Sequence, residues 1–188
     1  ADQTSGIFEM RPFFWKNKKK IPIYGSPRTI SELKKKYTFC FSQRHGYRPI
    51  MKAYKVKNKL IIKKKNNNLI IEPIDVIHGM IKATGFIFNK VAYISDCNMI
   101  PNKSLNKLLN LNYLIIDCLR KDKHPSHFNY EDALSLIKII KPKKSILTNL
   151  HVDLDYFKLK KKLPKNIIPA FDGLSFNMPF EVTKRGYN

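Results

Sequence analysis

The chain has 188 residues, of which 43% are hydrophobic and 12% aromatic, and this composition excludes a disordered chain. No apolar run reaches the roughly 18–20 residues of a transmembrane helix, so we expect no membrane partner. The formal net charge of +22 leaves two explanations open. One is a compositional bias toward Lys, Ile and Asn, and the other is a surface selected to bind polyanions such as nucleic acid.

The first half of the sequence predicts short helices followed by strands. Apolar spacing favours a helix in the first twenty residues, Ser26-Pro27 is typical of a helix start, and period-two alternation after Pro49 indicates strands. The expected elements are helices at 4–18 (interrupted at Pro12) and 27–37, and strands at 21–24, 51–57, 60–62, 69–71, 86–88 and 91–94. We expect tight turns at Asn66 to Asn68 and at Asn89-Lys90.

After Asp96 the pattern changes to alternating helices and strands. The expected helices are 105–111, one that Asn129 caps and that ends before Pro142, and 155–163; the expected strands are 113–116, 145–148 and a closing pair within 167–176. No linker or repeat interrupts the pattern, so we expect one domain over residues 1–188, in the α/β to α+β range.

Polar side chains follow four apolar strands at the point where each strand ends. His78, Asp96 and Asp117 end three of these runs, and His151 lies just beyond a fourth. Residues at strand ends can gather at one rim of a sheet. Imidazole and carboxylate together suit zinc, manganese or iron, so these positions predict a metal site.

The three cysteines, Cys40, Cys97 and Cys118, are widely spaced and form no metal-binding pair. We expect them to be buried free thiols, as is usual in the reducing cytoplasm. The expected location of the protein is therefore cytoplasmic.

Several short motifs, taken in order, resemble one protein family. They are Ala1-Asp2-Gln3-Thr4 with Gly6, Ile77-His78-Gly79, Ser95-Asp96, 116–120, His124-Pro125-Ser126-His127, 147–151 and 171–174. This series resembles the metallo-β-lactamase superfamily, and within it the branch of the phosphoribosyl cyclic phosphate phosphodiesterases. The resemblance implies an α+β fold, the αβ/βα four-layer sandwich of that family, with its N-terminal strands missing from the chain.

The resemblance also implies two divalent metal ions, zinc in preference to manganese. Ala1-Asp2-Gln3 is similar to the last three positions of the family motif H-x-H-x-D-H, so Asp2 would be a ligand of the second metal. Gln3 stands where the family has a histidine, and this departure removes one ligand from that metal. His78 would complete the first site and Asp96 would bridge the two metals.

The family pattern places the last ligand directly after Thr148. This chain has Asn149 there, and His151 follows two residues later. We expect His151 to be the ligand, with a locally shifted backbone.

The implied reaction is hydrolysis of a small phosphodiester or cyclic phosphate by a hydroxide that the metals share. His127 resembles the residue that protonates the leaving alkoxide or contacts the substrate phosphate, and Asp2 is the other residue expected to act in catalysis. Asp117 is expected to orient ligands through hydrogen bonds.

Two other functions remain open. One is an RNA-processing nuclease like the tRNA 3′-end endonucleases of the same superfamily. The other is a non-catalytic nucleic-acid-binding protein on a degenerate hydrolase scaffold. A homodimer is also open. We expect residues 1–188 alone to be inactive, because two motif histidines would precede Ala1.

Overall fold

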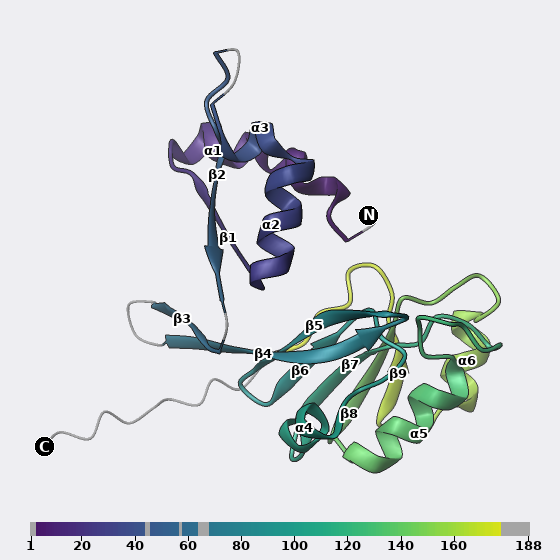
Figure 1. The fold of residues 1–188 in the computed structure, drawn as a ribbon. Helices are drawn as coiled ribbons and strands as arrows, with labels where there is room; N and C mark the ends of the chain where they lie inside the picture. The colour runs from purple at the N-terminus through teal and green to yellow at the C-terminus, as the bar shows by residue number, and fades with distance from the viewer. Residues whose placement is uncertain (1–2, 44–45, 57, 64–67, 178–188) are drawn as a thin grey trace, which may run out of the picture. The chain divides into compact units, whose positions relative to one another are not determined.

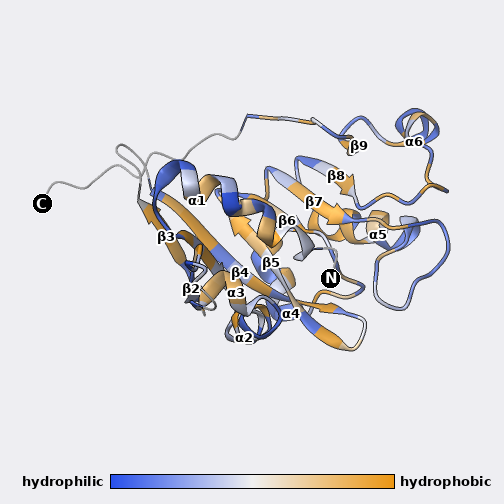
Figure 2. Cartoon of the chain, turned by 90° about the horizontal axis from the view of Figure 1, so that it is seen from above, coloured by the Kyte–Doolittle hydropathy of each residue, from blue (hydrophilic) through white to orange (hydrophobic). Residues whose placement is uncertain are grey.

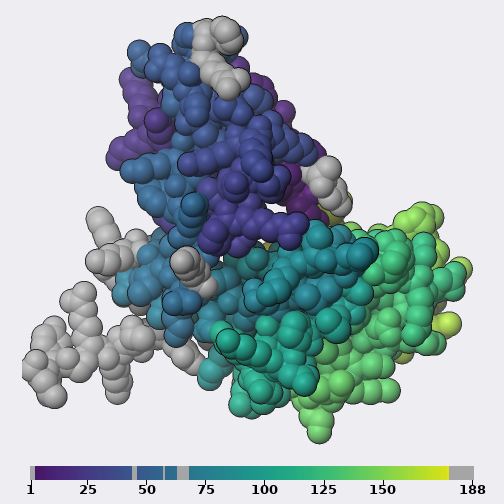
Figure 3. Space-filling model, viewed as in Figure 1, coloured from purple at the N-terminus to yellow at the C-terminus, as the bar shows by residue number. Residues whose placement is uncertain are grey.

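The structure is a computed structural model that describes residues 3–43, 46–56, 58–63 and 68–177. The contacts between residues divide the chain into two compact units, Ala1–Asn58 and Lys59–Asn188. Side chains fill the space between the helices and strands within each unit (Figure 3). The expectation of a single domain stays a prediction.

The first unit holds a two-stranded sheet and short helices (Figure 1). Its elements are η1 (Ser5–Met10), α1 (Arg11–Asn17), β1 (Ile21–Gly25), α2 (Pro27–Lys36), α3 (Thr38–Phe41) and β2 (Met51–Lys55). Strands β1 and β2 are parallel, so α2 and α3 form the crossover that a parallel pair requires. The Ser26 hydroxyl caps α2 by accepting a hydrogen bond from the Thr29 amide, as the sequence predicts. A small core forms around Cys40, Ile50 and Met51.

The second unit is built on a seven-stranded sheet with the order β3-β4-β5-β6-β7-β8-β9. Its elements are β3 (Leu60–Lys63), β4 (Asn68–His78), β5 (Ile81–Phe88), β6 (Val91–Ile94), α4 (Asn102–Leu105), η2 (Asn106–Leu108), β7 (Tyr113–Asp117), α5 (Tyr130–Ile140), β8 (Lys144–Thr148), α6 (Tyr156–Lys162) and β9 (Ile167–Pro169). This mixture of antiparallel hairpins, parallel strands and helices confirms the predicted α+β class.

The strand directions place four strand ends at one rim of the sheet. Strand β5 is antiparallel to both β4 and β6, so β4 and β6 run in the same direction. Strands β6, β7 and β8 pair in parallel. The carboxyl ends of β4, β6, β7 and β8 therefore lie at the same rim, which is where the sequence places its His and Asp residues.

Helix α5 covers one face of this sheet and contributes to the main core. Its side chains Ala133, Leu136, Ile137 and Ile140 belong to the same cluster as Leu114, Ile116 and Leu147 of the central strands. Figure 2 shows these strands as largely hydrophobic (orange) and the loops as largely hydrophilic (blue). The Asn129 side chain accepts a hydrogen bond from the Asp132 amide at 2.8 Å and so caps the helix as predicted.

Several predicted boundaries differ from the structure. The expected helix at 105–111 is α4 followed by the 3-10 turn η2, which ends at Leu108. Within the described residues up to 177, only β9 is present of the expected closing pair, and Gly173 turns the chain with a φ of +89°. Strand β4 is one continuous element, because its pairing with β5 extends from Ile71 to His78.

The two expected tight turns have different outcomes. Asn89 and Lys90 both have positive φ, which confirms a two-residue hairpin turn between β5 and β6. Residues Asn66 and Asn67 of the other turn lie outside the described residues. Among the described helices, none combines the length and apolarity needed to cross a membrane.

Two isoleucines on α5 test the assignment of the core. Ile137 is 4% exposed and Ile139 is 60% exposed. We expect Ile137→Ala to lower the free energy of unfolding by about 2–5 kcal/mol, because it leaves a cavity. The matched variant Ile139→Ala is expected to change it by less than about 0.5 kcal/mol. Urea unfolding followed by circular dichroism measures both, and equal losses would contradict the assignment.

Candidate metal centre

Three side chains converge at the rim formed by the strand ends. His78 is the last residue of β4, Asp96 follows β6, and His127 lies in the loop between β7 and α5. One nitrogen or oxygen atom from each lies within 4.8 Å of the others. The His78 and His127 ring centroids are 4.6 Å apart, and the His127 Nδ1 is 3.8 Å from the Asp96 Oδ1.

The His78 ring is oriented by a backbone carbonyl. Its Nδ1 lies 2.8 Å from the carbonyl oxygen of Ser126. A carbonyl only accepts hydrogen bonds, so Nδ1 carries the proton and Nε2 keeps its lone pair. This is the tautomer that a metal-binding histidine needs.

Gly79 allows the loop with Ser126 to come this close to β4. Its φ is +62°, and a Cβ at this position would lie 3.1 Å from the Ser126 Cβ. The Gly79 amide also donates a hydrogen bond to Asn98 Oδ1 at 2.8 Å. The turn after β4 therefore depends on glycine, both for its backbone conformation and for the space it leaves.

Asp117, the last residue of β7, is a fully buried carboxylate beneath the cluster. Its Oδ2 accepts from the Cys97 amide at 3.0 Å and lies 2.7 Å from the His127 Nδ1, and its Oδ1 accepts from the Asn149 side chain at 3.2 Å. Burial raises the pKa of this carboxyl above its ordinary value, and the hydrogen bonds oppose that rise. Asp117 thus fixes the His127 ring through Nδ1, the orienting role that the sequence predicts.

Two neighbours shape the rest of the site. The Ser95 hydroxyl donates to Asp96 Oδ2 at 3.0 Å. The His124 ring centroid is 5.0 Å from that of His127, and the Ser126 amide donates to the His124 Nδ1 at 3.3 Å. Burial, followed by the charges of His127 and Arg120, lowers the pKa of His124.

The structure brings together only part of the predicted ligand set. His78 and Asp96 are adjacent as expected, whereas the side chain of His151 is 55% exposed and its Nδ1 lies 3.1 Å from Asp153 Oδ1. In the described residues His151 is not a member of the three-residue cluster. Asp2 lies outside the described residues. The ligand roles of His151 and Asp2 stay predictions.

His127 belongs to this cluster, whereas the sequence predicts for it a role toward the substrate. The His124 to His127 motif is the signal that the sequence offers for this residue. Its position beside His78 depends on the path of the loop, which two backbone hydrogen bonds fix: Phe128 N to Cys97 O at 2.7 Å and Leu119 N to Phe128 O at 2.9 Å.

The residues present fit a divalent metal ion. Two imidazoles and one carboxylate are a donor set that suits zinc. The Nδ1 atoms of His78 and His127 each have an oxygen partner, as is common for histidines that bind a metal through the other ring nitrogen.

The three cysteines are all buried and free, which confirms that expectation. Burial raises the pKa of the Cys40 and Cys97 thiols, and that of the Cys118 thiol to about 12. Thiols with raised pKa values are poor nucleophiles and poor metal ligands.

Comparisons with known proteins agree with this geometry. Residues 1–149 match the model of the beta-lactamase superfamily domain. A crystal structure of a diphosphatase from the PhnP family is 26% identical, with a TM-score of 0.79 over 90% of this chain and 64% of that chain. The metallo-β-lactamase-fold protein YhfI of Bacillus subtilis is 17% identical, with a TM-score of 0.67 over 89% of this chain and 69% of that one.

A curated relative gives a match over a smaller part of its length. An octanoyltransferase of Porphyromonas gingivalis is 25% identical over 177 residues, which cover 92% of this chain and 35% of that protein. The chain thus spans about a third of the curated relative and less than two thirds of the diphosphatase chain. The family model covers most of the chain, and the solved structures share its fold. The chain therefore belongs to the metallo-β-lactamase superfamily of hydrolases.

Proposed function

We propose that the protein is a metal-dependent hydrolase of phosphodiesters, with a small phosphodiester or cyclic phosphate as substrate. The observation that carries this proposal is the cluster of His78, Asp96 and His127, with Asp117 buried behind it. The diphosphatase with 26% identity supports phosphorus chemistry, because that protein also acts on phosphate groups.

His78 and Asp96 would hold a divalent ion, zinc in preference to manganese. A bound ion of this kind lowers the pKa of a water molecule and stabilises the negative charge that develops on a phosphoryl oxygen. Two ligands are too few for a stable site, so Asp2 and His151 remain the proposed further ligands, including those of a second ion.

His127 lies close enough to the other two residues to act as a ligand or as a proton donor. We assign it the donor role, because the buried Asp117 carboxylate lies 2.7 Å from its Nδ1 and orients the ring. The Nε2–H of His127 donates its proton to the ester oxygen as the bond from phosphorus to that oxygen breaks, and the leaving group departs as an alcohol.

Acyl transfer is not supported by the described residues. The name of the Porphyromonas gingivalis relative belongs to a protein of which this chain matches 35%. The thiols here are buried and have raised pKa values, so none is suited to attack an acyl group.

Hydrolysis of RNA is a second candidate for the same site. The observation that favours it is the net charge of +22, which would attract a polyanionic substrate. A parallel assay on cyclic nucleotides and on labelled RNA separates the two, because the first proposal predicts turnover of the small substrate and the second predicts turnover of RNA alone.

The variant Asp117→Asn tests the orienting carboxylate. We expect the affinity for zinc to change by less than threefold and kcat on a phosphodiester with an alkoxide leaving group to fall by about 10–100-fold, because His127 loses its anionic partner. Zinc competition with a chelator and steady-state kinetics on the full-length protein measure both. Asp122→Asn, at an exposed position of the same loop, is the matched control. Unchanged kcat in Asp117→Asn would contradict the role.

The variant His127→Ala separates a proton donor from a ligand. We expect the bound zinc to be retained while kcat falls by about 10²–10⁴-fold on a phosphodiester with an alkoxide leaving group. The fall should be smaller with p-nitrophenolate, which leaves without a proton. Metal analysis together with kinetics on both substrates provides the measurement. Loss of zinc would identify His127 as a ligand instead, and equal falls on both substrates would exclude proton donation.

The variant His151→Ala tests the remaining predicted ligand. If His151 binds metal, its loss should lower the zinc affinity by more than about tenfold, because each ligand of a tetrahedral site contributes strongly to binding. Isothermal titration of the metal-free protein with zinc measures the change. Val152→Ala, at an exposed neighbouring position, is the control. An affinity equal to that of the control would remove His151 from the ligand set.

A further inference from the structure

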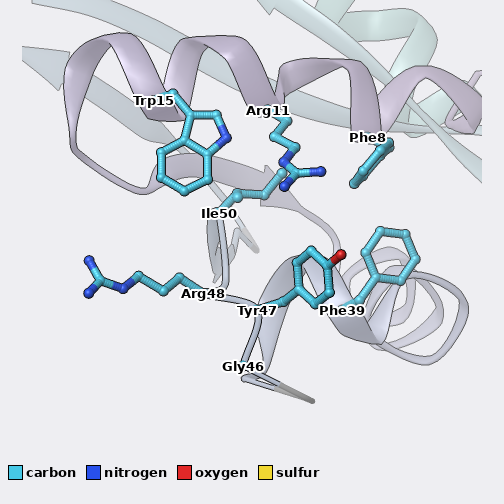
Figure 4. Close-up of a pocket in the computed structure, with 8 residues that line it drawn as sticks. All are labelled: Phe8, Arg11, Trp15, Phe39, Gly46, Tyr47, Arg48 and Ile50. Carbon is cyan, nitrogen blue, oxygen red and sulfur yellow. The ribbon is translucent and has the colours of Figure 1, made fainter.

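A second candidate site lies within the first unit of the chain. It is a pocket of about 490 Å³, and half of its eight lining residues are aromatic (Figure 4). Four aromatic side chains and two arginines give it its chemistry: Phe8, Trp15, Phe39, Tyr47, Arg11 and Arg48. The pocket lies in residues that the hydrolase site does not use.

All four aromatic side chains of the pocket are exposed to solvent. Trp15 is 55% exposed and Tyr47 is 62% exposed. The rings of Phe8 and Phe39 contact each other edge to face, with their centroids 5.4 Å apart. Exposed aromatic side chains gathered around one hollow mark a surface that binds a partner. The rings of Trp15 and Tyr47, with the planar guanidinium of Arg11 beside both, offer stacking surfaces to a planar ligand.

Arg11 restricts the charge of the ligands that the pocket can bind. The Arg11 guanidinium lies 5.5 Å from the Phe8 ring centroid, 5.9 Å from that of Trp15 and 5.7 Å from that of Tyr47. It therefore occupies the position that a bound ammonium group would need, which makes the pocket unsuitable for a cationic ligand. No acidic side chain is among the lining residues of this pocket.

Arg48 gives the pocket a charged end. Arg48 and Trp15 are on the left in Figure 4 and Phe8 and Phe39 are on the right, and the Arg48 side chain extends outward, away from Tyr47. A guanidinium beside a stacking surface can bind the phosphate that adjoins a stacked base. The surrounding sequence is also basic, since residues 1–58 contain fourteen Lys or Arg and three Asp or Glu.

We propose that this pocket binds a base of single-stranded nucleic acid, with the base stacked on the Arg11 guanidinium and the Trp15 and Tyr47 rings beside it, and its phosphate on Arg48. The charge of the pocket complements a polyanion, and its aromatic faces complement the bases. Acidic peptides share the negative charge but lack the planar rings, so they would not use the aromatic wall. This site would extend the function of the protein to nucleic-acid binding, whether or not the metal centre is a phosphodiesterase.

The sequence provides its own probe, because Trp15 is the only tryptophan. We expect an oligoadenylate of about eight nucleotides to quench the Trp15 emission saturably at low salt, with an affinity that falls as salt rises. Tyr47→Leu should weaken binding by about tenfold, the effect expected for a lost stacking surface. Arg48→Gln should weaken it and reduce the slope of log affinity against log salt by about one.

Matched controls come from the same unit. Tyr54→Leu and Arg28→Gln change exposed residues outside the pocket and should leave the affinity within about twofold. Unfolding midpoints identify any variant that fails to fold, and Arg48→Lys then tests the arginine with its charge retained.

The proposal is overturned if the oligonucleotide gives no quenching, if pocket and control variants lose affinity equally, or if an oligoglutamate quenches as well as the oligonucleotide. Asp96→Asn should bind the oligonucleotide normally, so failure here is distinct from failure of the hydrolase proposal.

Discussion

The candidate site depends on one buried carboxylate. Asp117 is fully buried at the end of β7, where an unpaired charge would be costly. Its partners come from three different segments: the Cys97 amide after β6, the His127 ring from the following loop and the Asn149 side chain after β8. The contacts of this one carboxylate therefore connect the loops that follow three neighbouring strands.

The topology of the sheet gives that interaction its place. Parallel pairing of β6, β7 and β8 brings their carboxyl ends to one rim, and the hairpins formed by β4, β5 and β6 bring His78 to the same rim. The two histidines are oriented in the same way, because the Nδ1 of each lies at hydrogen-bond distance from an oxygen atom. The Nε2 of each is not used in that contact. A rigid rim with oriented imidazoles suits a site that must bind a metal in a defined geometry.

Much of the fold could be predicted from the sequence, because its signals are local. The Ser26 and Asn129 caps and the turn at Asn89-Lys90 each depend on residues within a few positions of one another. The predicted adjacency of His78 and Asp96 followed from strand ends, which need only the sheet order.

The rest of the site depends on contacts between distant residues. The position of His127 is set by Asp117, and Asn149 binds that same carboxylate. In the aromatic pocket of the first unit, Phe8, Trp15 and Tyr47 lie around Arg11. The spacing of these residues along the chain does not predict this arrangement. Such arrangements arise from the paths of loops, whose local sequence does not determine where they pack.

The most direct test of the central claim is anomalous X-ray diffraction at the zinc edge, from crystals of the full-length protein grown with zinc. The account predicts a peak about 2.0–2.1 Å from the Nε2 of His78, adjacent to the Asp96 carboxylate. A fully occupied peak elsewhere on the protein, with none beside His78 and Asp96, would contradict it.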